Sequence, residues 1–433
     1  MDPLVQITVV FAVFLGLLAA GMAVPLAILV PGVVYLWLQG GLPALKGLGL
    51  VSWGSMNSFT LTAIPLFLLM AEILQRSGLS KRVYRGLSGF VAPLPGGLLQ
   101  TNIAGCAVFA SITGSSVATA VTIGRVALPQ LLSRGYSPSL SAGSLAAGGT
   151  LGILLPPSLA MIVYGAFTET SVARLFMAGI IPGAILTALF MTYIAIHALA
   201  RPQDAPREHG FGTLAAAGRG ALDLLPFVFL IGGILGSLYA GLATPTEAAA
   251  LGCVMSIFIA RIWGDLTWKT FRECVRDSVP VIGNILLIIY AAYVFSYAIS
   301  MGGLGERLTV YVISLGLSKL EFFFALFVMY TILGCLIESL GMIVLTVPLL
   351  HPVLQSYGID SIWFGVILVL FIELGQISPP IGINLFVIQS IWNGKLSQVV
   401  FGTIPFHLLM FVLLALLVFF PELALWLPSK MNR

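Results

Sequence analysis

Charged residues are scarce in this sequence. Only 8% of the 433 residues are Asp, Glu, Lys or Arg, whereas 59% are hydrophobic, and the mean hydropathy is +1.07. A soluble domain carries about 25% charged residues, so this composition excludes a water-exposed globular protein and predicts that the solvent is lipid. The net charge of +4 says little about partners. We expect a lipid bilayer around the chain and no nucleic-acid partner.

Cysteines and long polar segments are also few. The four cysteines lie far apart in apolar surroundings, which indicates packing residues rather than disulfides or metal ligands: Cys106, Cys253, Cys274 and Cys335. The N-terminus has no basic region before its first apolar run and reads as a membrane span, not a removable signal. The longest polar stretch, 201–219, is long enough only for a linker.

Several catalytic signatures are missing. The sequence contains no Gly-x-x-x-x-Gly-Lys-Ser/Thr, no His-Glu-x-x-His and no Gly-x-Ser-x-Gly, and its four histidines show no metal spacing. An ATPase is therefore excluded, and a membrane-embedded enzyme lacks the acid/base or metal cluster it would need. We expect no enzyme activity and no cofactor, so active transport by this chain would draw on an ion gradient.

The sequence does contain one pattern twice, once in each half. Leu-Gly-x-x-x-Pro-Pro occurs at 151–157 and again at 374–380, inside apolar sequence. Glycine and proline set backbone geometry, so the repeated feature is a broken helix rather than a composition. Paired Gly/Pro-interrupted apolar segments in two halves of a membrane protein point to a transporter's binding site. A packing kink without function is the alternative for either copy alone.

The remaining apolar sequence divides into spans and two hairpins. From about 20 residues per crossing, we expect spans at 4–20, 22–39, 60–76, 138–168, 180–200, 221–240, 246–262, 279–299, 360–393 and 403–427. Residues 93–133 and 317–356 each rise to a polar cluster and return, so we interpret them as re-entrant helical hairpins whose tips face protein or water. Two full spans in each segment are the alternative. Stretches 44–57 and 264–277 are expected to lie along the interface.

Re-entrant hairpins give each half an odd number of crossings, so the halves are inverted. The predicted fold is an all-α polytopic membrane protein with two inverted repeats, each with a hairpin and a broken helix. Most Lys and Arg then fall on one side, which the positive-inside rule makes cytoplasmic. Opposed hairpins in inverted repeats imply alternating access.

Each broken helix should present free carbonyls beside the polar tip of its own hairpin. Carbonyl and hydroxyl oxygens with few full charges suit an alkali cation. The candidate cation ligands are Ser115, Ser116, Gly149, Thr150 and Gly152 in the first half, and Ser339, Gly341, Gly375, Gln376 and Ser378 in the second. Half-helix N-termini suit a substrate carboxylate. The candidate substrate residues are Thr113, Gly114, Ser115, Pro156, Pro157, Pro379, Asn384 and Arg125.

Four intramembrane charges leave alternatives open. Glu338, at the second tip, could join a cation site or cap the helix that follows, and Glu373 is similarly open. Arg125 could neutralise an anionic substrate, but its long stem could equally reach the interface. Glu72 is expected to pair between helices.

These residues resemble a known family over essentially the whole chain. The resemblance is to the large membrane subunit of tripartite ATP-independent periplasmic (TRAP) transporters of the four-carbon-dicarboxylate type. It is carried by Ile64-Pro65-Leu66-Phe67, Thr113-Gly114-Ser115-Ser116, Gly149-Thr150-Leu151-Gly152, Ala243-Thr244-Pro245-Thr246-Glu247 and Ser378-Pro379-Pro380-x-Gly382-x-Asn384. Ser378 stands where the family usually has Thr, and Glu338 where Asp is common.

The resemblance implies a sodium-coupled importer of an organic acid anion in the bacterial inner membrane. It implies an elevator mechanism, a small four-helix membrane subunit and a periplasmic substrate-binding protein. The corresponding division is scaffold at 1–92, transport part at 93–182, connecting spans and scaffold at 183–316, transport part at 317–405, and a last span at 406–433. A stand-alone divalent-anion/sodium symporter and an ion channel are the alternatives.

Overall fold

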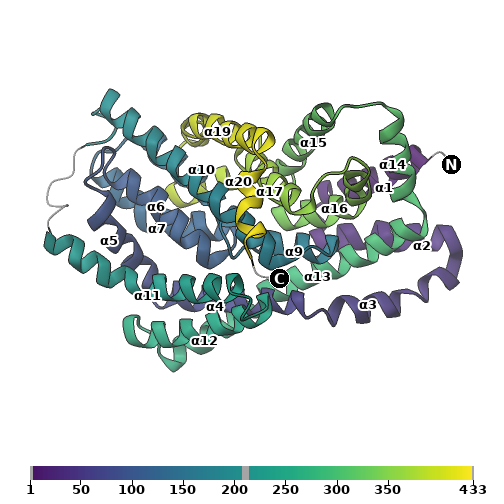
Figure 1. Ribbon diagram of the computed structural model, residues 1–433, viewed down its shortest axis with the longest axis horizontal. Coiled ribbons are helices and arrows are strands. Elements are labelled where there is room, and N and C mark those ends of the chain that lie inside the picture. The colour runs from purple at the N-terminus through teal and green to yellow at the C-terminus, as the bar shows by residue number, and fades with distance from the viewer. Residues whose placement is uncertain (1–2, 207–213, 432–433) are drawn as a thin grey trace.

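The computed structural model describes residues 3–206 and 214–431 (Figure 1). Within these residues the chain forms α-helices and one short 3₁₀ helix, and no strand. Eight of the described helices are long and apolar enough to cross a membrane, or up to nine if a bent pair counts as one span. The all-helical membrane fold predicted from composition is therefore confirmed.

The first half contains the predicted hairpin and broken helix in sequence order. Its helices are α1 (Pro3–Ala19), α2 (Val24–Leu45), α3 (Leu48–Met56), η1 (Thr60–Thr62), α4 (Ala63–Arg76), α5 (Leu79–Val91), α6 (Leu98–Thr113), α7 (Ser116–Ser133), α8 (Pro138–Leu154), α9 (Leu159–Thr168) and α10 (Val172–Ala200). The hairpin is α6 and α7, and the broken helix is α8 and α9.

The second half repeats this order. Its helices are α11 (Leu214–Tyr239), α12 (Pro245–Trp263), α13 (Trp268–Met301), α14 (Leu304–Ser314), α15 (Lys319–Gly334), α16 (Ser339–Ser356), α17 (Ser361–Ile377), α18 (Ile383–Trp392), α19 (Leu396–Phe419) and α20 (Glu422–Ser429). The interval along the chain from α7 to α16 equals that from α8 to α17, at both helix ends, and it equals the interval between the two Leu-Gly-x-x-x-Pro-Pro motifs. The spacing read from the motif is therefore the spacing of the helices.

Glycines and capping side chains account for several helix ends. Gly78 and Gly303 have φ of 75° and 62° and immediately precede α5 and α14, and this left-handed conformation favours glycine. Ser318 caps α15 in a capping box with Glu321. The left-handed glycines and the capping side chains therefore explain where these helices begin.

One expectation was wrong. The stretch 264–277 does not form a separate interfacial helix, because α13 runs without interruption from Trp268 to Met301 through Pro280. In the first half the corresponding region is divided, and the pair Leu48–Met56 and Thr60–Arg76 is bent by 53°. The only breaker in the second copy is one proline, which kinks a helix without necessarily ending it.

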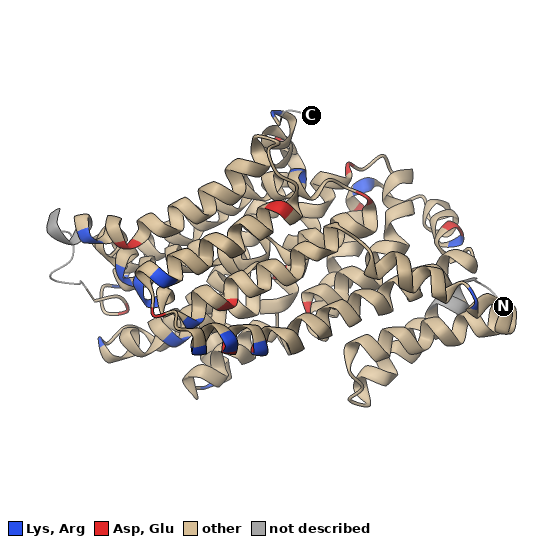
Figure 2. Cartoon of the chain, turned by 90° about the horizontal axis from the view of Figure 1, so that it is seen from below, with Lys and Arg blue, Asp and Glu red and all other residues tan. Residues whose placement is uncertain are grey.

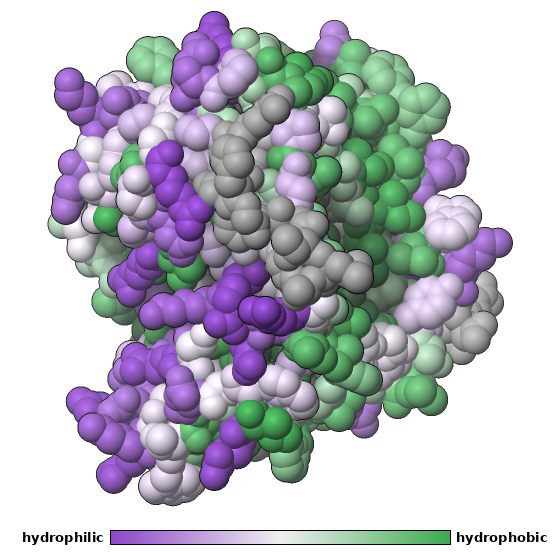
Figure 3. Space-filling view, turned by 90° about the vertical axis from the view of Figure 1, so that its left-hand side faces the viewer, coloured by the Kyte–Doolittle hydropathy of each residue, from purple (hydrophilic) through white to green (hydrophobic). Residues whose placement is uncertain are grey.

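The most buried helices are the first arms of the two broken helices. Every residue of α8 from Leu140 and of α17 from Trp363 is buried, whereas many large apolar side chains on α2, α3, α11 and α19 are exposed, as expected for a lipid-facing surface. Figure 2 shows more Lys and Arg toward its left-hand end. Figure 3, which views that end, shows hydrophilic residues gathered there beside apolar surface.

Candidate functional site

A cavity of about 520 Å³ lies between the two hairpin tips and the helices α4 and α13. Its polar lining comes from both halves of the sequence and includes Glu72, Gln75, Thr113, Ser115, Glu338 and Ser339. Apolar residues of α4, α7, α9, α13 and α18 complete it. The predicted tips therefore reach one shared space, although they belong to different halves of the chain.

Four helix N-termini border this cavity. The helices α7, α9, α16 and α18 each contribute residues from their first turn, namely Val117, Leu159, Leu340 and Ile383. The unsatisfied N–H groups at helix starts carry partial positive charge and favour anions. The arrangement follows from the repeat, since in each half one hairpin arm and one broken-helix arm begin at this cavity.

The first hairpin tip is packed directly on the first broken helix. A Cβ at Gly152 would collide with the carbonyl oxygen of Ser115, and one at Gly149 would lie 2.7 Å from the Cβ of Ala120. The backbone N–H of Leu159 donates to the carbonyl of Gly114 at 3.3 Å. Glycines on α8 therefore let the tip approach backbone to backbone.

Hydroxyl groups hold the first tip together. Thr119 Oγ1 donates to the Ser115 carbonyl at 2.8 Å and lies 2.7 Å from Thr113 Oγ1. Thr150 Oγ1, on α8, donates to the Ala147 carbonyl at 2.7 Å and is fully buried. Thr119 was not among the sequence candidates. Its position one helical turn after Ser115 is the signal that could have found it.

Asn384 connects the halves at this tip. Its Nδ2 donates to the Ser116 hydroxyl at 2.5 Å, although Asn384 belongs to α18 and Ser116 to α7. Asn384 is fully buried and its Oδ1 has no hydrogen-bond partner among the described residues. A carbonyl oxygen is therefore left free beside the candidate cation ligands.

The second set of candidates is less concentrated than the first. Gly375 packs against Gly334, since a Cβ on Gly375 would lie 2.9 Å from the Gly334 Cα. Ser378 Oγ donates to the Leu374 carbonyl at 2.6 Å and lies 3.2 Å from His407 Nε2. Both contacts lie at the C-terminal end of α17.

The α16 candidates lie elsewhere. Ser339 lines the shared cavity. A Cβ on Gly341 would meet Ile337 and, at 3.4 Å, Val24 of α2. The second hairpin tip therefore lines the cavity through Ser339 and contacts the break after α17 through Cys335, whose thiol donates to the Ser378 and Pro379 carbonyls.

The prolines and Arg125 are placed differently from one another. Pro156 and Pro157 are buried in the first break, whereas Pro379 is exposed in the second. The side chain of Arg125 is exposed on α7 and is not among the residues that line the cavity. Arg125 and Pro379 are thus the substrate candidates that the structure sets apart from the first tip.

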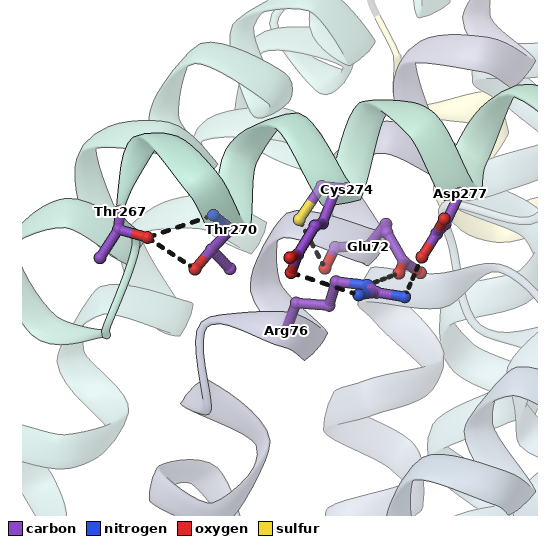
Figure 4. A network of polar contacts seen from close by, with 7 residues as sticks. Glu72, Arg76, Thr267, Thr270, Cys274 and Asp277 are labelled. Atoms are coloured by element: carbon purple, nitrogen blue, oxygen red, sulfur yellow. Dashed lines mark hydrogen bonds and ion pairs between the residues drawn. The ribbon is translucent and has the colours of Figure 1, made fainter.

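Glu72 joins a polar network at the edge of the cavity (Figure 4). It forms an ion pair with Arg76, which also pairs with Asp277 of α13. The Cys274 thiol donates to the Glu72 backbone carbonyl at 3.8 Å. The expectation that Glu72 pairs between helices was wrong, because its carboxylate pairs with Arg76 one turn later on α4, and it is Arg76 that reaches α13 through Asp277.

Gln75 is a second residue that sequence reasoning missed. It lines the cavity from α4, and its Nε2 donates to Thr122 Oγ1 on the first hairpin. This hydrogen bond joins the helix packed on α13 to the hairpin packed on α8.

Comparison with known proteins gives a consistent result. A family model described as "Tripartite ATP-independent periplasmic transporter, DctM component" matches residues 10–423. The chain is 31% identical to the C4-dicarboxylate TRAP transporter large permease protein DctM of Vibrio cholerae, covering 98% of this chain and 97% of that protein. It is 30% identical to the sialic acid TRAP transporter large permease protein SiaM of the same species, covering 96% and 97%.

A solved structure has a similar fold. The YdaH transporter of Alcanivorax borkumensis superimposes with a TM-score of 0.65 at 16% identity, covering 90% of this chain and 89% of that one. At this level of identity the likeness concerns the fold alone.

Proposed function

Because the chain belongs to the DctM component family of tripartite ATP-independent periplasmic transporters, we propose that it is the sodium-coupled subunit that carries an organic acid anion across the bacterial inner membrane. It is a multi-pass transporter subunit and not an enzyme. We propose a small four-helix membrane subunit and a periplasmic substrate-binding protein as its partners.

The observation that carries this proposal is the cavity on which four helix N-termini converge. A carboxylate there would lie at the positive dipole ends of these helices and beside the hydroxyl groups of the two tips, in a cavity that apolar side chains complete. Relatives are named for C4-dicarboxylates and for sialic acid, both of which are carboxylates. We therefore propose a carboxylate substrate and leave its identity to the binding protein that delivers it.

Sodium is proposed for the oxygen-rich tips. At the first tip the Ser115 carbonyl, the Thr119 hydroxyl and the orphaned Asn384 oxygen lie around the start of α7. Neutral oxygens in a dry site bind alkali cations without a fixed counter-charge. The substrate's own charge would then offset the cation's, which couples the two.

The sodium assignment is tested by Ser116→Ala and Ser378→Ala. In proteoliposomes with the partner subunits, each variant is expected to need about tenfold more sodium for half-maximal uptake, because one oxygen that holds a ligand or tip in place is lost. Ser390→Ala, which removes an exposed hydroxyl on α18, is the matched control. Wild-type sodium dependence in both test variants would refute the assignment.

We propose that the transport parts, 93–182 and 317–405, move as one body against the remaining scaffold. The supporting contact is the hydrogen bond from Gln75 to Thr122, because it is a single polar link between α4 and the first hairpin and can break without leaving a charge. The α4–α13 network, by contrast, holds scaffold to scaffold through charged pairs.

A disulfide between Gln75→Cys and Thr122→Cys tests this movement. Full cross-linking is expected to abolish uptake, and reduction is expected to restore it. The same pair kept reduced is the internal control. Undiminished uptake after complete cross-linking would favour a rocking movement without displacement of the hairpin.

Stoichiometry gives a separate test. For a dianionic substrate, two sodium ions only balance the charge, whereas a third adds about 2.3 kcal/mol per 100 mV. We expect uptake of a dianion to respond to a clamped membrane potential at a fixed sodium gradient. A voltage-insensitive rate would rule out the third ion.

A further inference from the structure

Glu373 is the most deeply buried charged side chain that the structure describes. Its exposed fraction is 0%, and neither of its carboxylate oxygens has a hydrogen-bond partner among the described residues. Gln376, three residues later on α17, is 1% exposed, and both its side-chain oxygen and its nitrogen are also unpartnered. Four side-chain polar atoms, on two residues one turn apart in α17, therefore have no hydrogen-bond partner among the described residues.

Asp223 shows how this chain treats another buried carboxylate. Asp223 is 8% exposed, and it accepts hydrogen bonds from Arg82 Nε at 2.7 Å and Arg85 Nε at 2.9 Å. Neither Glu373 oxygen has a hydrogen-bond partner among the described residues, so no Lys or Arg supplies such a counter-charge there. A buried carboxylate without a partner is strongly disfavoured, so Glu373 is either protonated or paired with a bound cation.

Glu373 and Gln376 lie on a different face of α17 from the second candidate site. Phe371 and Gly375 face α15, where Phe371 lies 6.1 Å from the Tyr330 ring and Gly375 packs on Gly334. Glu373 is two residues from each of them, which at 3.6 residues per turn places it on the opposite side of the helix.

Near the start of α17, the face that carries Gln376 also carries Gly365, three turns earlier, and meets α9 and α10. A Cβ on Gly365 would lie 2.7 Å from Leu175 of α10 and 2.9 Å from Tyr164 of α9. α17 also packs against α8. Glu373 and Gln376 belong to α17, so the unpartnered atoms lie inside the proposed transport body.

We propose that Glu373 and Gln376 bind a sodium ion together, so that Gln376, a candidate of the second set, acts with Glu373 rather than with Gly375 and Ser378. A carboxylate and an amide oxygen are ligands that a hard monovalent cation accepts, and the cation supplies the missing counter-charge. The site deepens the proposed function and rests on it. It adds, to the sodium proposed at the neutral tips, one ion held by a fixed negative charge that travels with the transport body.

The test is sodium-dependent thermal stabilisation of the purified chain, with NaCl replaced by choline chloride at constant ionic strength. An ion that binds only the folded state raises the unfolding midpoint with its concentration. Glu373→Gln, which keeps the shape and removes the charge, is expected to raise the sodium concentration for half-maximal stabilisation at least about tenfold. Glu306→Gln, at an exposed position on α14, is the matched control.

Gln376→Met is a second variant, which keeps the proposal testable if Glu373→Gln does not fold. It removes the amide oxygen but keeps the chain length, and a smaller weakening of the sodium effect is expected. Wild-type sodium dependence in both variants would overturn the proposal and leave Glu373 as a neutral buried acid. Absence of any sodium effect in the wild-type chain would instead refute the sodium coupling itself, so the two failures are distinguishable.

Discussion

The two hairpins have helical arms of the same lengths but pack differently. In the first half α7 lies along α8, with Gly149 opposite Ala120. In the second half α16 packs mainly on α9, α13 and α14, and only lightly on α17. The residues at the corresponding positions, Ile372 and Ile343, explain the difference, because two bulky β-branched side chains keep the helices apart where glycine and alanine let them touch.

The breaks in the two broken helices also differ, in how well neighbouring residues cover them. The first is covered by the tip of its own hairpin, since the Gly114 carbonyl accepts from Leu159 N–H and Ser158 is fully buried. In the second, Pro379 and Ile381 are exposed, and the Cys335 thiol is the nearby donor to the Pro379 carbonyl, at 3.6 Å. The first break is therefore covered by its own hairpin tip, whereas the second is exposed at Pro379 and Ile381.

The largest effect is expected from replacing Gly149 with isoleucine, the residue at the equivalent position, 372, of the second half. Gly149→Ile would drive a branched side chain into Ala120, and overpacking at this contact is expected to cost about 3 kcal/mol or more and to abolish uptake. Proteoliposome uptake and thermal unfolding measure the two effects. Ile372→Val is the control, with an expected cost of about 0.5–1.5 kcal/mol. Equal tolerance of both changes would mean that the packing difference has no consequence.

A smaller effect is expected from loosening the helix that leads into the first hairpin. α5 is fixed to α11 by the pairs of Arg82 and Arg85 with Asp223. Asp223→Asn removes the charge that both guanidiniums share, and since Arg85 is largely exposed we expect a loss of about 1–2 kcal/mol.

Thermal unfolding of Asp223→Asn is the measurement, with Glu306→Gln on the corresponding helix α14 as control. The control is expected to change stability by less than about 0.5 kcal/mol. A stability loss of the same size in both variants would argue that α5 is no more firmly fixed than α14.

The smallest effect is expected in how readily a water-soluble reagent reaches the two helix breaks. Ser158 and Ile381 occupy equivalent positions in the two repeats, but Ser158 is fully buried and Ile381 is 43% exposed. A thiol at Ile381→Cys is expected to react with a water-soluble reagent at least about tenfold faster than one at Ser158→Cys. Mass spectrometry of the labelled chain measures this, and the four natural cysteines are buried. Equal rates would remove the distinction between the covered and the exposed break.

The arrangement of elements could be predicted because glycine, proline and polar tips act locally. The breaks after Leu154 and Ile377, and the hairpin turns before Ser116 and Ser339, fall where the sequence interrupts its apolar runs. The continuous α13 could not be predicted, because a proline within an apolar helix permits either a kink or an end.

The candidate site was predictable only in part. The first-tip residues Ser115, Ser116, Gly149 and Gly152 were recognisable because they sit in or beside the repeated motif and the polar tip. Thr119 and Gln75 were not, because each acts through a partner from another turn or another helix.

The sequence by itself determined the class of solvent, the inverted repeat and the places where helices break, since composition and backbone chemistry act over short distances. Only the tertiary structure decided that Asn384 of one half bonds Ser116 of the other, that Arg125 lies away from the cavity, and that Glu373 is buried without a counter-charge. Those outcomes depend on which helices contact one another. Contacts between helices of different halves are set by the packing of the whole molecule, and no local sequence signal specifies them.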